Sequence, residues 1–140
     1  MKMLGEKFSD KRGIFLILGI GADLVEIERI QKMAAKFPGK FAERIFTARE
    51  TAYCRRFRDW AGRYAARLAA KEAVFKALGT GLARGVKWRE VEVVNSPAGS
   101  PEVILSGRTA VLAKEKGVRK VHLTLSHGKN AAVAFVLLEG

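Results

Sequence analysis

An alanine-rich stretch from about Asp59 to Leu78 is the longest periodic segment of the chain. Alanine has the highest helix propensity of the amino acids, and larger apolar side chains recur within this stretch at helical spacing. Gly79 follows directly, and glycine is typical of the position just after a helix. We therefore predict a helix over 59–78, whose small side chains around Glu72 let it pack closely against a sheet.

Apolar periodicity and turn residues divide the remaining chain into shorter elements. A buried strand is expected from Ile14 to Gly21, and a helix from about Leu24 until Phe37–Gly39. Further expected elements are a helical turn at 41–46, a helix begun by a capping box of Thr47 and Glu50, a hairpin at 88–105, a helix at 107–116 and a second hairpin at 118–138. This order predicts an α+β fold with an antiparallel sheet packed against helices.

Length and composition restrict the class of protein. The chain has 140 residues, of which 49% are hydrophobic, and this favours one folded domain over 14–140 preceded by a flexible leader over 1–13. Its net charge of +12 predicts an anionic partner: a nucleic acid, a membrane surface, an acidic protein or a phosphate-rich small molecule. The single cysteine, Cys54, excludes an internal disulfide and favours the cytoplasm. No apolar run is long enough to span a membrane.

Asp23 is the first candidate for chemistry, because it follows the expected glycine-terminated strand and precedes the expected helix. Its carboxylate has two possible roles. It caps the helix by accepting backbone N–H bonds, or it presents oxygens to a hard divalent cation. The sequence around Asp23 leaves both alternatives open.

Glu72 and Lys76 are the second candidate pair, since residues i and i+4 of a helix share one face. Lys71 points about 100° away from Glu72 on the same helix. The pair is either a surface ion pair or part of a metal or phosphate site. Small neighbours weaken the first alternative, because a carboxylate packed closely against a sheet needs a partner such as a metal or phosphate.

His127 follows Ser126 at the end of an expected strand. A histidine there is either structural or a ligand for a phosphate group. Two carboxylates, a lysine and a histidine, with a glycine-rich loop after the lysine, are together typical of a magnesium-assisted phosphate site. Magnesium takes one or two protein carboxylates and completes its coordination with water and substrate phosphates.

Three segments resemble the holo-acyl-carrier-protein synthases, the small class of 4′-phosphopantetheinyl transferases. They are Gly-Ile-Gly-x-Asp-Leu-Val-Glu-Ile-x-Arg at 19–29, Ala-Ala-Lys-Glu-Ala-x-x-Lys-Ala at 69–77 followed by Gly79-Thr80-Gly81, and Ser126-His127. The resemblance covers about 16–138. It implies the fold of that family and the transfer of the phosphopantetheine arm of coenzyme A to a serine of acyl carrier protein. Such a reaction releases adenosine 3′,5′-bisphosphate and supports fatty acid biosynthesis.

The resemblance also implies roles for individual residues. Asp23 and Glu72 would hold Mg²⁺ against the pyrophosphate of coenzyme A, and with Lys76 they would form the catalytic group. The residues that would bind the coenzyme are Lys76, Gly79, Gly81 and His127. The two glycines have an alternative role as the helix stop. The general base stays open between Glu72 and a water molecule.

Family resemblance further implies two protein partners. The acyl carrier protein is acidic, and Arg29, Met33 and Lys36 at helical spacing would dock it. The alternative is a solvated helix face with Met33 turned into the core. The family is typically a homotrimer with active sites between subunits, so the same assembly is expected for this chain.

A small nucleic-acid-binding protein is the rival interpretation. Its support is an arginine cluster, Arg49, Arg55, Arg56 and Arg58, interleaved with the aromatic residues Tyr53, Phe57 and Trp60. No recognised nucleic-acid module accompanies the cluster, and the rival leaves both carboxylate motifs unexplained. A transferase of broader carrier range is a further alternative, although such enzymes usually contain two tandem copies of this unit.

Overall fold

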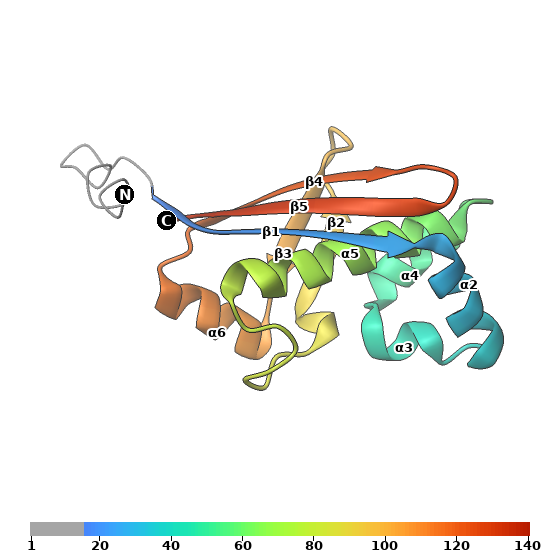
Figure 1. Cartoon of the computed structure of the whole chain (residues 1–140), viewed down its shortest axis with the longest axis horizontal. Helices are drawn as coiled ribbons and strands as arrows, with labels where there is room; N and C mark the ends of the chain where they lie inside the picture. Colours follow the sequence, from blue (N-terminus) through green and yellow to red (C-terminus); the bar gives the residue numbers. More distant parts are fainter. Residues whose placement is uncertain (1–15) are drawn as a thin grey trace.

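A computed structural model describes residues 16–140 (Figure 1). The expected leader over 1–13 and the first two residues of the expected strand at 14–21 lie outside the described part. The elements in chain order are β1 (Ile17–Glu26), α2 (Ile27–Lys36), α3 (Phe41–Ile45), α4 (Ala48–Cys54), α5 (Trp60–Leu78), the 3₁₀ helix η1 (Trp88–Glu90), β2 (Val91–Asn95), β3 (Pro101–Leu105), α6 (Gly107–Lys116), β4 (Lys120–His127) and β5 (Ala131–Glu139).

Two antiparallel ladders form the β part of the fold. The larger sheet has the strand order β1-β5-β4, and β2 pairs with β3 in a separate ladder. Helix α5 runs along one face of the larger sheet (Figure 1). The expected α+β fold with an antiparallel sheet against helices is thereby confirmed. Among the described helices, none has both the length and the apolar composition needed to cross a bilayer.

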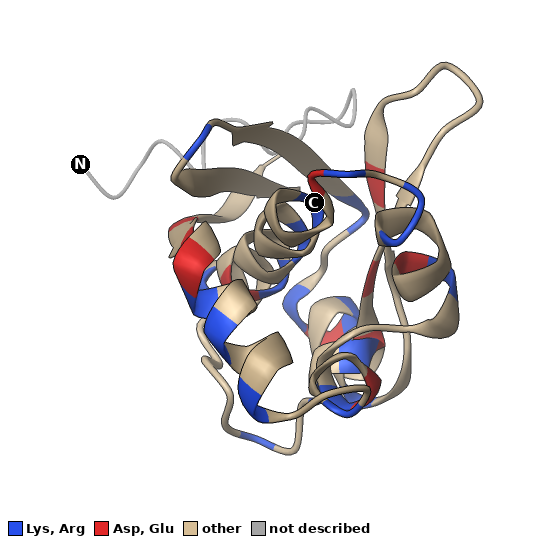
Figure 2. Cartoon of the chain, turned by 90° about the vertical axis from the view of Figure 1, so that its right-hand side faces the viewer, with Lys and Arg blue, Asp and Glu red and all other residues tan. Residues whose placement is uncertain are grey.

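Lysine and arginine are unevenly distributed over these elements. The three strands of the larger sheet contain a single lysine, Lys120, and no arginine. Figure 2 shows the basic residues concentrated on helices and loops instead. The net positive charge is therefore carried mainly outside the sheet.

Helix α5 forms as predicted and is buried along most of its length. Ala65, Ala69 and Ala73 have no exposed surface, and Gly79 ends the helix in the left-handed conformation at a φ of 78°. Alanine leaves little bulk on the helix surface, which permits the sheet to approach its backbone closely.

Two glycines of β1 permit that close approach. A Cβ atom built on Gly21 would lie 2.0 Å from the carbonyl oxygen of Ala73, and one on Gly19 would lie 2.2 Å from that of Ala77. Real Cβ atoms do not approach backbone oxygens so closely. The strand thus rests directly on the helix backbone, and any side chain at these two positions would separate them.

The start of the chain differs from the expectation in one respect that concerns the site. Strand β1 continues to Glu26, so Asp23 lies within a strand and does not begin a helix. Pairing with β5, which extends to Glu26 opposite Ala131, holds these residues extended. The strand is also not fully buried, because its alternate side chains are exposed. The capping alternative for Asp23 is therefore wrong, and α2 begins after Glu26 without a side-chain cap.

Two other boundaries also differ. The sequence predicts that the helix begun by Thr47 carries Arg49, Arg55, Arg56 and Arg58. Helix α4 has the expected capping box but ends at Cys54, so the last three of these arginines follow the helix. The expected hairpin at 88–105 begins with the single turn η1, and its first strand starts only at Val91. Burial raises the pKa of the Cys54 thiol to about 12, which keeps this side chain a neutral core residue.

A fully buried ion pair joins three elements and was not foreseen. The Glu50 carboxylate accepts hydrogen bonds from Thr47 N at 2.9 Å, Lys71 Nζ at 2.7 Å and Val93 N at 2.9 Å. Lys71 also donates to the carbonyl oxygen of Val91. Burial lowers the pKa of Lys71, and the charge of Glu50 opposes this shift. The pair fixes the rotation of α5 relative to α4 and β2.

Gly21→Ala tests the close crossing of β1 over α5. The added methyl group has to displace either the strand or the carbonyl of Ala73. We expect the free energy of unfolding in urea to fall by about 1–3 kcal/mol, the usual cost of overpacking. The control is Gly128→Ala, because a Cβ there meets nothing within 4 Å. Equal stability of the two variants would contradict the crossing.

Candidate functional site

The first two sequence motifs meet where β1 crosses α5. Lys76 Nζ lies 2.9 Å from Asp23 Oδ1 and 3.1 Å from the carbonyl oxygen of Ala22. The Asp23 side chain is only 14% exposed, whereas that of Lys76 is 56% exposed. Asp23 and Lys76, which are 53 positions apart in the chain, thus form an ion pair. The carboxylate is largely buried, and the lysine reaches it from the surface.

Glu72 lies one helical turn before Lys76 and, at i and i+4, on the same face of α5. Its carboxylate contacts Arg29 of α2, with Oε1 at 3.4 Å from Nη2. In residues 16–140 each of the two motif carboxylates is therefore paired with a cation from another element. The alternative in which Glu72 and Lys76 form an ion pair with each other is not seen in this part of the chain.

The donor set fits a hard divalent cation. Asp23 Oδ2 is buried and has no hydrogen-bond partner. A buried unpaired carboxylate oxygen is costly, and a cation would satisfy it. The described residues contain no cluster of three or more His, Cys, Asp and Glu suited to a metal. Two carboxylates match magnesium, which completes its coordination with water and phosphate, and they do not match a zinc site with three or four protein ligands.

The third motif lies elsewhere in the same chain. His127 ends β4 and contacts the first turn of α5, where its Nε2 is 3.0 Å from Asp59 Oδ2. A Cβ built on Gly62 would lie 3.1 Å from the ring. Ten residues of helix separate Gly62 from Glu72, which corresponds to about 15 Å along the axis. The structure thus brings Asp23, Glu72 and Lys76 together and leaves His127 apart.

His127 lines two cavities that contain further cations. One has a volume of about 220 Å³ and is also lined by Arg63 and Arg67, and the other, of about 410 Å³, is lined by Arg58 and Lys129. Sequence analysis did not single out Arg67, although an arginine within an alanine-rich buried helix is unusual. Its Nη2 bonds Asn95 Oδ1 at 2.9 Å, and its buried Nε has no partner. The surroundings of His127 suit an anionic ligand.

Gly79 and Gly81 lie at the C-terminal end of α5, in agreement with their alternative role as the helix stop. The N–H of Gly79 donates to the carbonyl of Lys76 at 3.0 Å, and that of Gly81 donates to the carbonyl of Phe75 at 3.3 Å. Both backbone donors are therefore already used at the helix end. A contact of these glycines with coenzyme A stays a prediction.

The three docking candidates lie on α2 next to the site. Arg29 and Lys36 are exposed, and Met33 packs partly against the core. Of the three, Arg29 reaches the site through its contact with Glu72. The α2 surface therefore adjoins the cluster of Asp23, Glu72 and Lys76.

The aromatic residues near the arginine cluster are used within the fold. The Arg63 guanidinium lies 4.0 Å from the Phe57 ring centroid, and that of Arg67 lies 4.1 Å from the Tyr53 centroid. Trp60 contacts Tyr64 edge-on at 6.2 Å. These contacts weaken the argument for a base-stacking surface, because such a surface needs free aromatic faces.

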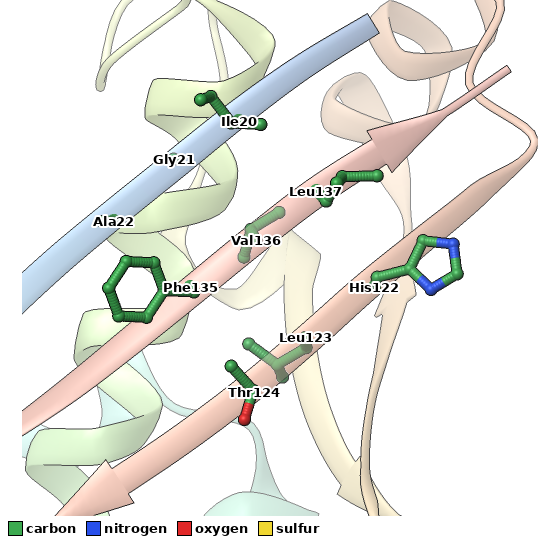
Figure 3. A pocket seen from close by; sticks show the side chains of 9 residues that line it. All are labelled: Ile20, Gly21, Ala22, His122, Leu123, Thr124, Phe135, Val136 and Leu137. Atoms are coloured by element: carbon green, nitrogen blue, oxygen red, sulfur yellow. The ribbon is translucent and has the colours of Figure 1, made fainter. Parts of the chain in front are cut away.

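An apolar hollow of about 450 Å³ lies on the face of the larger sheet opposite α5. Figure 3 shows the side chains of Ile20, Phe135 and Leu137 on this face, drawn from β1 and β5. Ile20 is 71% exposed and Phe135 58%. Asp23, Glu72 and Lys76 are not among its lining residues. We call this surface the open sheet face.

Comparisons with known proteins agree with the three motifs. Residues 19–136 match the model of the 4′-phosphopantetheinyl transferase superfamily. The chain is 44% identical over 124 residues to a holo-acyl-carrier-protein synthase of Geotalea daltonii, covering 89% of this chain and 99% of that one.

Solved structures agree as well. The crystal structure of the holo-acyl-carrier-protein synthase from Neisseria meningitidis has a TM-score of 0.82 and 34% identity, covering 89% of this chain and all of that one. The synthase from Bacillus anthracis in complex with coenzyme A (3′,5′-ADP) has a TM-score of 0.73 and 39% identity, covering 89% of this chain and 97% of that one. The chain therefore belongs to the 4′-phosphopantetheinyl transferase superfamily and, within it, to the holo-acyl-carrier-protein synthases.

Proposed function

We propose that this enzyme transfers the 4′-phosphopantetheine group from coenzyme A to a serine of an apo acyl carrier protein, with Mg²⁺ as cofactor. One observation carries the proposal: the Asp23 carboxylate has a buried oxygen without a partner, Oδ2, while its other oxygen, Oδ1, lies 2.9 Å from the cation Lys76. A metal ion and a lysine are the groups that bind a pyrophosphate. The complex of the Bacillus anthracis relative with coenzyme A supports the same substrate.

Different residues of the chain would bind the cation and the phosphates. Asp23 and Glu72 would hold the cation, and bound Mg²⁺ would neutralise charge on the coenzyme A pyrophosphate. Lys76 Nζ would contact the same phosphates and stabilise the charge that develops on the leaving adenosine 3′,5′-bisphosphate. The serine oxygen forms the new bond to phosphorus as the pyrophosphate P–O bond breaks, and the serine proton passes to the general base, either Glu72 or a water molecule. Most of the catalysis then comes from positioning and charge neutralisation.

We further propose a homotrimer with sites between subunits. The separation of about 15 Å along α5 between the levels of His127 and Glu72 is compatible with a coenzyme molecule that contacts His127 of one copy and the carboxylates of another. The open sheet face supplies an apolar surface that a second copy would cover, with Leu24 also 57% exposed.

Carrier protein would dock on α2. Arg29 and Lys36 offer positive charge to an acidic partner, and Met33 offers an apolar contact between them. Docking there would bring the carrier serine close to Glu72, which Arg29 already touches. The net charge of +12 would draw such a partner to the enzyme.

A role in fatty acid biosynthesis and a cytoplasmic location complete the proposal. The substrate class implied by the family is the carrier of growing acyl chains. The free, buried thiol of Cys54 is typical of a protein from a reducing compartment.

Glu72→Gln tests the assigned chemistry. The amide keeps the size of the side chain but loses the charge that binds the cation. With apo acyl carrier protein, coenzyme A and Mg²⁺, mass spectrometry should show the added phosphopantetheine with wild-type enzyme. We expect the variant to be slower by about 100-fold or more.

Glu115→Gln is the matched control, because Glu115 is an exposed carboxylate on α6. It should transfer at the wild-type rate. Near-normal turnover by Glu72→Gln would refute the role of Glu72. No mass shift on any acidic carrier with the wild-type enzyme would refute the transfer reaction itself.

Phe135→Glu tests the trimer. A charge at the centre of a covered apolar interface leaves an unpaired buried ion, so the assembly should dissociate. Light scattering after size exclusion should change from the mass of three copies to that of one, while circular dichroism keeps its shape. Val111→Glu, at an exposed apolar position on α6, should stay trimeric. A wild-type protein of monomer mass at every concentration would contradict the proposal.

A further inference from the structure

The imidazole of His127 packs against the N-terminal end of α5, between Asp59 and Gly62. Asp59 directly precedes the helix and contacts the ring from one side, with Oδ2 at 3.0 Å from Nε2. Gly62, one turn further on, lies so close that a Cβ there would be 3.1 Å from Cδ2 and 3.6 Å from Nε2. The Asp59 carboxylate therefore contacts the ring on one side, and the missing side chain of Gly62 leaves space for the ring on the other.

Asp59 is itself held on both oxygens. Its Oδ1 accepts from Arg63 Nε at 3.3 Å while Oδ2 faces His127. The hydrogen bond with His127 is the largest of the contacts that lower the Asp59 pKa, and Arg63 lowers the pKa further. Asp59 is thus ionised at neutral pH and can only accept hydrogen bonds. The ring nitrogen that faces it, Nε2, has to be the donor.

The other ring nitrogen stays available. Among the described residues none is hydrogen-bonded to Nδ1 of His127. The two nitrogens of an imidazole lie on different edges, so a donor bond from Nε2 to Asp59 fixes the direction in which Nδ1 points. Nδ1 then accepts a hydrogen bond in the neutral ring and donates one in the imidazolium. When the ring carries two protons, Nε2 donates to Asp59 and Nδ1 can donate to a phosphate oxygen.

We propose that Asp59 is a positioning residue, which orients His127 and keeps Nε2 protonated so that Nδ1 is presented to the phosphates of coenzyme A. This inference rests on the proposed function, because it takes His127 as a contact of the nucleotide portion. Asp59 would act through His127 and not on the ligand itself, and the neighbouring Arg63 offsets its negative charge. The cations Arg67 and Lys129, which line the cavities beside the ring, leave the surroundings favourable for an anion.

The chain offers an internal control in its second histidine. His122 Nε2 lies 3.3 Å from Glu139 Oε1, so the same kind of pair occurs twice. His122 does not line either cavity beside His127. Glu139→Gln therefore removes an equivalent carboxylate from a histidine without a predicted role in the nucleotide site.

The experiment uses the whole protein with ¹⁵N-labelled histidine. Nitrogen NMR on the two imidazoles reports which nitrogen carries the proton, and His122→Asn assigns the signals. Asp59→Asn should abolish the preference of His127 for the Nε2–H form, and Asp59→Glu should largely restore it. Glu139→Gln should leave the His127 signals unchanged.

Coenzyme A binding by calorimetry and transfer kinetics complete the test. We expect Asp59→Asn to weaken coenzyme A binding by about 10-fold, the lower end of the effect that follows when a metal-ligating histidine loses its outer hydrogen-bond partner. The rise should appear in KM, with kcat at saturating coenzyme A within about 2-fold of wild type, because the phosphoryl-transfer residues are untouched. Glu139→Gln should bind normally.

His127→Asn separates the two levels of inference. If it weakens coenzyme A binding and Asp59→Asn does not, the role of Asp59 is overturned and the proposed function stands. If His127→Asn binds normally, the nucleotide role of His127 and the role of Asp59 both fail. Tighter binding by Asp59→Asn would also overturn the inference, since Asp59 would then compete with the ligand for His127.

Discussion

The contact of β1 with the backbone of α5 is the constraint on which the rest of the structure depends. Gly19 and Gly21 leave no side chains between the strand and the carbonyls of Ala77 and Ala73. Side chains alternate along a strand, so Asp23 faces the helix in the same way as Gly21. The close approach therefore brings the carboxylate within 2.9 Å of Lys76. Larger residues at the glycine positions would separate the two halves of the site.

Two consecutive residues of helix α5, Lys71 and Glu72, have different roles: the first stabilises the fold and the second belongs to the candidate site. Lys71 turns inward and forms a buried ion pair with Glu50, whereas Glu72 turns toward Arg29 of α2. Removal of one partner of a buried pair leaves an uncompensated charge, so the inner pair resists rotation of the helix. The outer carboxylate then holds a fixed direction. Preorganisation of this kind is what a site needs if its catalysis comes from positioning.

Local patterns predicted the parts of the fold that local forces decide. The helix over 59–78, its glycine stop and the capping box of Thr47 and Glu50 all formed as expected. Asp23 was misplaced because the preference for a strand there comes from pairing with β5, more than a hundred residues later in the chain. No local signal identifies Glu50 as the partner of Lys71, or Asp59 as the partner of His127. The motifs named candidate residues, and the fold decided which of them lie together.

The most direct measurement of the central claim is a crystal structure grown with coenzyme A and with Mn²⁺ in place of Mg²⁺. Anomalous scattering locates Mn²⁺ without ambiguity. We expect one peak between Asp23 Oδ2 and the Glu72 carboxylate, with the coenzyme pyrophosphate beside it and Lys76 moved from Asp23 toward the phosphates. A Mn²⁺ peak away from these carboxylates, or a pyrophosphate bound far from Lys76, would contradict the account.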